Sequence, residues 1–260
     1  MNYQIATLRL AVALGSISLA AGHGVVTGIV AGGTYYTGYE PLSPVPNIAS
    51  WSTPLNLEHG FVPSSNFTTP DIICHAGATP GQNSISVKSG ESLTLQWSAP
   101  WVGGHHGPVM SYLANCNGSC SSLPDKTALK FFKIEDAGII ERTPFPAYYA
   151  ADELRDHNSS WTVWIPPTLK SGNYVLRHEI IALHVAEDLG GAQAYPQCIN
   201  LNVAGTGSDN PVGQSAETLY KETDPGILID IWQFGNATYI IPGPAVWSGA
   251  VQHAQPAVNR

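Results

Sequence analysis

The chain has 260 residues, enough for one or two domains, and carries 11 basic against 19 acidic residues. This acidic balance makes nucleic acid and anionic membranes poor partners. Only 12% of the residues are charged, whereas Gly (26), Pro (20), Trp (7) and Tyr (11) are plentiful. Such a composition is typical of a β protein with long, shaped loops.

The first 21 residues have the build of a secretion signal, with a polar start, an apolar run from Leu10 to Ala21 and small residues at its end. The run is too short to span a bilayer, which needs about 20 apolar residues in a helix. Cleavage after Gly22 would make His23 the first residue of the mature chain, although the small residues equally permit a cut one or two positions earlier. We expect a secreted protein whose residues 1–22 are removed, with no membrane anchor.

The cysteines and glycosylation sequons also indicate export. Four cysteines in an exported chain predict two disulfides, and three pairings are possible. The short separation of Cys116 and Cys120 suits a small local loop, which leaves Cys74 to pair with Cys198. The four Asn-x-Ser/Thr sequons, which are candidates for glycosylation, are at Asn66, Asn117, Asn158 and Asn236.

The segment organisation predicts one domain over residues 23–260, because no linker or internal repeat divides it and no carbohydrate-binding module follows. Turn residues separate many short strand-like runs, and Tyr148–Asp156 is the one short helix that we expect. The fold class is therefore an all-β, immunoglobulin/fibronectin-like sandwich with long loops and little helix. The expected strands are Val25–Ala31, Ile85–Val87 paired with Ser92–Trp97 across the turn "KSG", Val109–Ala114, Leu129–Ile134, Trp161–Ile165, Tyr174–Val185, Cys198–Val203 and Ile227–Trp232.

Two histidines stand on a Gly-rich turn, "WVGGHHGPV", just before a predicted strand. His105 and His106 are either exposed imidazoles of a polar turn or metal ligands held at a strand end. In the later run "NYVLRHEIIALH", strand alternation puts His178 and His184 on one largely apolar face and Glu179 on the other. Each of these two histidines is either a hydrogen-bonded core residue or part of a site.

His23 would gain a new ligand by cleavage. As a first residue it would carry a free α-amine beside its imidazole, and the two could chelate a metal together. One further imidazole would complete a set of three nitrogens, which favours Cu(II). An internal histidine could not act in this way, because its backbone nitrogen is an amide.

The ordered motifs "HGVV" after the signal, "HHGPVMSYLANC", "RHEIIALH", "GAQAYPQC", "YKETDPGILIDIW" and "YIIPGPAVW" resemble the copper-dependent lytic polysaccharide monooxygenases of auxiliary activity family 9, formerly glycoside hydrolase family 61. The resemblance covers nearly the whole mature chain. It implies that one mononuclear copper ion is bound by His23 and His105, with Tyr195 at the axial position. It further implies that His184 and Gln193 hydrogen-bond the oxygen species, and it agrees with the two cysteine pairs.

The resemblance implies oxidative cleavage of β-1,4-glucan chains, with cellulose first, at C1 and/or C4. O2 or H2O2 and an external electron donor, either a small reductant or a secreted redox enzyme, would be the co-reactants of a monomeric enzyme. We expect aromatic side chains to stack on the sugar rings. The candidates are Tyr239, from its place in "YIIPGP", followed by Tyr35, Tyr36 and Tyr39.

Three alternatives remain open at this point. A non-catalytic carbohydrate-binding sandwich would explain the fold and the aromatic residues but not the histidines. A hydrolase would need two carboxylates across a cleft or a three-ligand zinc site, and the sequence offers no convincing carboxylate pair. A copper-storage protein would bind the metal without oxidising sugars.

Overall fold

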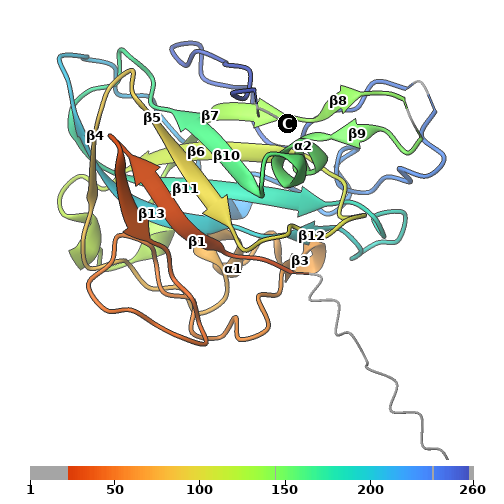
Figure 1. The fold of residues 1–260 in the computed structure, drawn as a ribbon, viewed down its shortest axis with the longest axis horizontal. Helices are drawn as coiled ribbons and strands as arrows, with labels where there is room; N and C mark the ends of the chain where they lie inside the picture. The colour runs from red at the N-terminus through yellow and green to blue at the C-terminus, as the bar shows by residue number, and fades with distance from the viewer. Residues whose placement is uncertain (1–22, 144, 236, 258–260) are drawn as a thin grey trace, which may run out of the picture.

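The computed structural model describes residues 23–143, 145–235 and 237–257, so the predicted signal segment and Asn236 lie outside the described residues. Two layers of mostly antiparallel strands form a sandwich (Figure 1). The smaller sheet has the order β10-β5-β1-β2, with bounds Ser160–Trp164, Ser92–Trp97, Val26–Ala31 and Thr34–Thr37. The predicted β-sandwich is confirmed.

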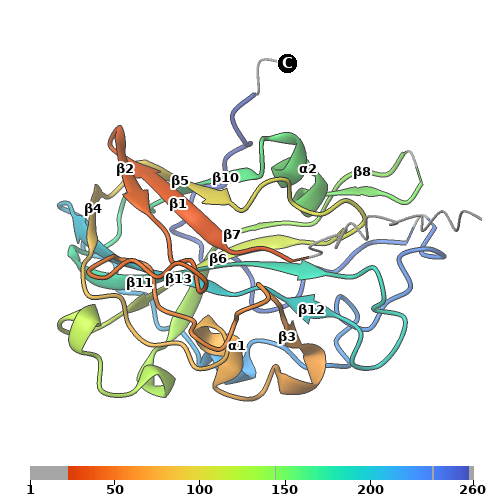
Figure 2. The same cartoon turned by 60° about the horizontal axis from the view of Figure 1, so that its bottom comes forward.

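The larger sheet has the path β3-β12-β11-β13-β4, and β6 joins β11 to β7 on its other side. Figure 2 shows the smaller sheet lying over this larger one. The strand bounds are Val62–Pro63 for β3, Gln193–Ala194 for β12, Gly172–Ala182 for β11, Gln197–Ala204 for β13, Ile85–Lys88 for β4, Val109–Asn115 for β6 and Phe131–Ala137 for β7.

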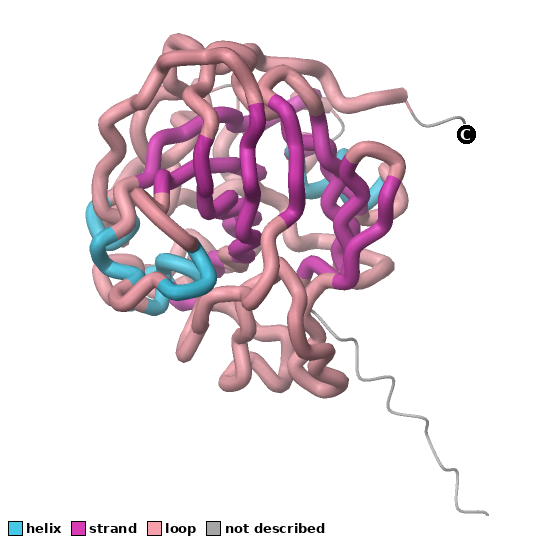
Figure 3. Tube along the Cα trace, turned by 90° about the vertical axis from the view of Figure 1, so that its left-hand side faces the viewer, coloured by secondary structure: helices cyan, strands magenta, loops and turns pink. Residues whose placement is uncertain are grey.

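Helices lie at the periphery of the strands (Figure 3). Two of them are α-helical, α1 (Asp71–Cys74) and α2 (Ala150–Asp156), so the expected helix is present within its predicted range. A two-stranded ribbon, β8 (Ile139–Glu141) and β9 (Tyr148–Tyr149), leads into α2. The 3-10 turns are η1 (Ser64–Asn66), η2 (Cys120–Ser122), η3 (Lys126–Ala128) and η4 (Ala216–Thr218). Within the described ranges no helix has the length and apolarity needed to cross a bilayer.

The structure corrects three strand predictions. β4 and β5 follow each other in sequence but do not form a hairpin, because β4 pairs in parallel with β13 while β5 joins the smaller sheet. β11 ends at Ala182, so His184 lies beyond the strand. The segment Ile227–Trp232 forms turns rather than a strand. Loop packing buries Ile227 and Ile231, which a strand pattern does not distinguish from burial by sheet pairing.

Both faces of the larger sheet are covered, which explains why β11 is buried along nearly its whole length. One core cluster fills the space between the sheets and includes Leu176 and Ile180. A second cluster, with Val175 and Ile181, lies between the larger sheet, α1 and the C-terminal loops. This alternation along β11 is the one that the sequence predicted.

Two disulfides stabilise this arrangement, Cys74–Cys198 and Cys116–Cys120, the pairing that the spacing favoured. The first closes a separation of 124 residues and joins α1 to β13. In the chain-entropy model a loop of that length stabilises the fold by about 5 kcal/mol. The bridge therefore holds the second core cluster against the sheet that supports the site described below.

Candidate active site

His23 lies three residues before the start of β1, and hydrogen bonds of Val25 and Val26 fix the chain that follows it. The Val25 amide donates to Ser98 Oγ (3.2 Å), and the Val26 amide donates to Gln197 Oε1 (3.2 Å). A Cβ at Gly24 would come within 2.9 Å of Ser98 Oγ and 3.0 Å of the Trp101 ring. A larger residue would force Ser98 or the Trp101 ring to shift, so this close packing favours glycine after His23.

His105 stands on the turn before β6, and its imidazole faces those of His23 and His184. The ring centroids of His23 and His105 are 6.5 Å apart and the planes are nearly perpendicular at 84°. His184 lies 4.1 Å from His105. Burial, reinforced by the two neighbouring imidazoles, lowers the pKa of His105 to about 4. The ring is therefore neutral at physiological pH and keeps a lone pair for a ligand.

A close backbone approach holds this turn against β11. A Cβ at Gly107 would come within 1.9 Å of the Ile181 carbonyl oxygen, so no other residue fits there. The Leu183 amide also donates to the His106 carbonyl (2.8 Å). The "HHGP" turn and the end of β11 are thus joined through the backbone, which explains why histidines about 80 residues apart in sequence meet.

Tyr195 packs beneath the histidines. Its ring centroid lies 6.3 Å from His23 and 6.5 Å from His105, and Trp101 approaches it edge-on at 5.2 Å. The hydroxyl donates to Gln193 Oε1 at 2.9 Å. Burial raises the pKa of Tyr195, which keeps it a neutral phenol. Since the Gln193 carbonyl is occupied by this bond, its amide NH2 remains able to donate.

His184 has a buried, unsatisfied ring nitrogen. Its Nδ1 has no hydrogen-bond partner among the described residues. Burial, followed by the nearby His106, lowers the pKa of His184. Buried polar atoms without partners are uncommon and often mark functional sites. The structure thus brings together all five residues that the resemblance implied: His23, His105, His184, Gln193 and Tyr195.

The other two candidate histidines have structural partners. His106 turns toward α2, where its Nδ1 lies 2.8 Å from Asp152 Oδ2. His178 is fully buried between Trp97, whose indole N–H donates to its Nε2 (3.2 Å), and Ser111, which lies 3.0 Å from its Nδ1. Burial lowers the pKa of His178 to about 3, so it is a neutral core residue.

The donor set fits copper better than a metal that needs three side-chain ligands. Within the described ranges no three His, Cys, Asp or Glu side chains are grouped as a metal site. A site built on His23 and His105 would have only two imidazoles, so its third nitrogen must come from the His23 backbone. That nitrogen is a peptide amide while Gly22 precedes it and becomes an amine only after cleavage. Three nitrogen ligands with an open coordination position suit Cu(II).

The structure overturns Tyr239 as a sugar-stacking residue. Its side chain is only 9% exposed, and its hydroxyl donates to the Gly226 carbonyl (3.0 Å). Its ring packs against Tyr149 and Phe234 at 5.6 and 6.3 Å. The motif "YIIPGP" therefore anchors the C-terminal loop to the second core cluster.

Two of the loop tyrosines also lie away from the histidines. Tyr35 and Tyr36 are on β2, and Tyr35 pairs with Val30, seven residues after His23, which is about 20 Å along a strand. Tyr36 packs against the core between the sheets. Tyr39 lines a separate cavity beside residues 44–48 and remains a prediction.

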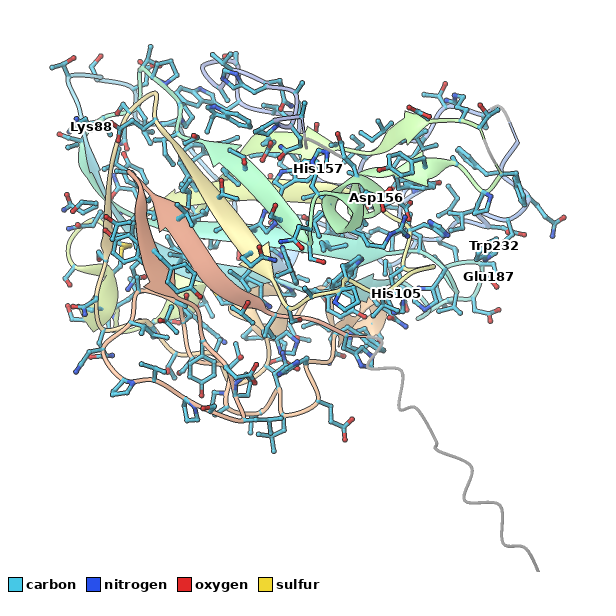
Figure 4. The ribbon with its side chains drawn as sticks, in the orientation of Figure 1. Lys88, His105, Asp156, His157, Glu187 and Trp232 are labelled. Atoms are coloured by element: carbon cyan, nitrogen blue, oxygen red, sulfur yellow. A yellow bond between two sulfur atoms is a disulfide. The ribbon has the colours of Figure 1, made fainter. Side chains whose placement is uncertain are left out.

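Trp232 is the aromatic residue that the sequence reasoning missed. It is 38% exposed and its indole N–H donates to the His184 carbonyl (3.0 Å). Its ring meets His106 edge-on at 5.7 Å. Figure 4 shows Trp232, Glu187 and His105 at the same end of the molecule. The sequence does show a Trp at the end of "DPGILIDIW". The incorrect prediction of a strand there meant that this Trp was not considered as a surface residue.

The carboxylates near the histidines do not form a hydrolase pair. Glu179 is fully buried on the opposite face of β11, where it pairs with Arg177 and Tyr220. Glu187 and Asp188 are exposed side chains of the loop that follows His184. A glycosidase needs two carboxyl groups about 5–10 Å apart across a cleft, and these residues do not provide them.

Residues 23–239 match the model of Auxiliary Activity family 9, formerly GH61, and the match begins at His23. The chain belongs to this family. It is 52% identical to AA9 family lytic polysaccharide monooxygenase A of Thermoascus aurantiacus over 87% of this chain and 100% of the relative. It is 50% identical to the protein of the same name in Talaromyces verruculosus, over 96% of this chain and 76% of that one.

A solved structure agrees with this assignment. The extended catalytic domain of H. jecorina LPMO9A superposes with a TM-score of 0.86 at 44% identity, covering 91% of this chain and 96% of that one. The protein is therefore an enzyme of the AA9 type, a lytic polysaccharide monooxygenase from a copper-dependent family. The alternatives of a non-catalytic sugar-binding sandwich and of a hydrolase do not fit this family.

Proposed function

We propose that the secreted enzyme is cut after Gly22 and that residues 23–260 act as one catalytic domain holding a single copper ion. The α-amine and Nδ1 of His23, together with the imidazole of His105, would be the nitrogen ligands, and the Tyr195 phenol would lie close to the ion. The observation that carries this proposal is the perpendicular pair of His23 and His105 rings above a phenol.

A bound copper ion would supply the redox chemistry, the activation of O2 or H2O2 with electrons from an external donor, that oxidises C1 and/or C4 of a sugar. The chain's own residues would orient the oxygen co-substrate and hold a proton for it. The Gln193 amide, fixed by Tyr195, would donate a hydrogen bond to the oxygen co-substrate. The unpartnered Nδ1 of His184 would hold or release a proton beside it.

We propose β-1,4-glucan, and cellulose first, as the substrate. The exposed Trp232 ring would stack on a sugar unit next to the histidines without depending on charge. This position replaces the one assigned to Tyr239 from the sequence. The electron donor would be a small reductant or a secreted redox enzyme, and the enzyme would act as a monomer.

The first test is the intact mass and N-terminal sequence of the secreted protein, with and without added Cu(II). We expect a chain that begins at His23 and gains one tightly held copper ion. Incubation with cellulose, O2 or H2O2 and a reductant should then release sugars oxidised at C1 or C4. A chain that begins one or two residues earlier cannot form the amine ligand, and release of unoxidised sugars alone would contradict the proposed chemistry.

A further inference from the structure

The sequons are the sequence motifs that the copper chemistry leaves unused, and the structure distinguishes among them. Asn158 is exposed in the turn between α2 and β10, in a left-handed conformation (φ 56°) that asparagine tolerates. Asn117 has the same exposure and a similar φ of 51°, but it lies inside the Cys116–Cys120 loop. Asn66 is half-buried in η1.

A groove of about 400 Å³ opens beside Asn158, and Asn158 itself is part of its wall. The floor is the outer face of β5 and β10, where Thr94 and Thr162 present hydroxyls 3.1 Å apart. The far wall is the C-terminal segment at Gln255 and Pro256. His157, labelled at the end of α2 in Figure 4, closes the near end. None of the described residues that line the groove is Asp, Glu, Lys or Arg.

The far wall is held by few contacts. The Thr162 amide donates to Gln255 Oε1 (2.8 Å), and Gln255 Nε2 donates back to the Thr162 carbonyl (3.0 Å) and to Glu135 Oε1 (3.4 Å). Two residues earlier, His253 stacks on Trp164 with centroids 4.6 Å apart. The Gln255 side chain thus takes the place of a neighbouring strand along the free edge of β10. The near wall is firmer, because Gln96 donates to the Asn158 carbonyl at 2.8 Å.

We propose that Asn158 carries an N-linked glycan whose first N-acetylglucosamine lies in this groove and holds the C-terminal segment against β10. Uncharged hydroxyls and an amide match the hydroxyl edge of a pyranose, and Pro256 matches its apolar face. The volume lies within the range of small-ligand sites. We identify this sugar as the occupant of the groove from the position of Asn158, because a sugar joined to Asn158 begins at the groove wall.

The modification joins Asn158 Nδ2 to C1 of the sugar of a lipid-linked oligosaccharide diphosphate. The amide nitrogen loses one proton, the bond between C1 and the phosphate oxygen breaks, and the lipid diphosphate leaves with that electron pair. The inference rests on the secretion in the proposed function but not on copper. A secreted protein without bound copper would therefore leave it intact.

Hydrogen exchange of the Thr162 amide measures how firmly the C-terminal segment is held, because this amide donates to Gln255 rather than to β5. Secreted wild type would be compared with Asn158→Asp and with the matched control Asn117→Asp by glycopeptide mass spectrometry and amide hydrogen exchange. Asp tolerates the same left-handed conformation but offers no amide to glycosylate. We expect Asn158 to be occupied.

Loss of that glycan should speed Thr162 exchange about fivefold, the factor that one net hydrogen bond gives. The Asn117 control, the β10 amides that pair with β5, and protein trimmed to one N-acetylglucosamine should all exchange as wild type does. A bare Asn158, or equal Thr162 rates with and without the glycan, would overturn the proposal. So would protection of Thr162 by added cello-oligosaccharide in protein bare at Asn158, which would assign the groove to external sugar.

Discussion

Two polar clusters, one on a face of β11 and the other beyond its end, differ in how completely their hydrogen bonds are satisfied. On the face under α1, Arg177 donates to the Ile72 and Ile73 carbonyls and to both oxygens of Glu179. At the end of β11, by contrast, His184 Nδ1 has no partner among the described residues. The first cluster is a closed network, because its polar groups are hydrogen-bonded to one another. The second is an open cluster, because it keeps a ring nitrogen that can still interact with a ligand.

Breaking the closed network should have the largest effect. Arg177→Met leaves the Glu179 carboxyl buried without its charged partner, and such losses cost about 3–5 kcal/mol of unfolding free energy. Denaturant unfolding would measure it. The matched control Lys88→Met removes an exposed pair with Glu91 and should cost less than about 1 kcal/mol. Equal losses in the two variants would contradict a structural role specific to the buried cluster.

Removing a ligand from the open cluster should act on copper rather than on stability. His105→Ala should weaken Cu(II) binding by more than ~100-fold, since even outer partners of metal ligands contribute 10–100-fold. His106→Ala is the control, because that ring is paired with Asp152 instead. Calorimetric titration of both variants with Cu(II) would measure the two affinities. A sub-micromolar affinity of His105→Ala for Cu(II) would contradict the assignment of His105 as a ligand.

The closed interior also predicts a pH effect on stability. Burial raises the pKa of Glu135 to about 8, so the folded protein keeps its proton while the unfolded chain loses it above about pH 4.5. The contribution of Glu135 to stability therefore falls as pH rises from about 4.5 to 8, by on the order of 1 kcal/mol per pH unit. Relative to wild type, Glu135→Gln should gain stability progressively over that range. A pH-independent difference between the two proteins would disprove the effect.

The smallest effect should come from the rim of the open cluster. Trp232→Ala removes the exposed ring beside His106 and should weaken binding to cellulose about tenfold, the upper range for one aromatic contact. Tyr35→Ala is the control, because its ring is 62% exposed but lies on β2. Pull-down isotherms on insoluble cellulose would compare them, and equal binding by the two variants would exclude Trp232 from the substrate surface.

The sequence predicted the sandwich and the site residues through two kinds of short-range information. Alternation along Tyr174–Ala182 identified the buried faces of β11, and the structure confirms them. Motif order supplied the site residues, which the fold brings together. The sequence did not separate His178 from His184 by any physical argument, because both stand on apolar runs and only their three-dimensional neighbours differ.

The errors have one physical origin. Periodicity shows that a side chain is buried or exposed, but it does not show what covers it. Trp232 ends one apolar run near the C-terminal end and Tyr239 begins another, and loop packing exposes the first and buries the second. The turn between β4 and β5 has the residues of a hairpin, yet the two strands enter different sheets.

By itself the sequence predicted the fold class, the cysteine pairs and the histidines proposed for the site, because local periodicity and the order of motifs are properties of the chain. Only the tertiary structure decided which histidine keeps an unpartnered nitrogen, which aromatic ring faces solvent and which sequon opens onto a groove. Each of these depends on contacts between segments far apart in sequence. Such contacts are set by how the loops pack on the two sheets.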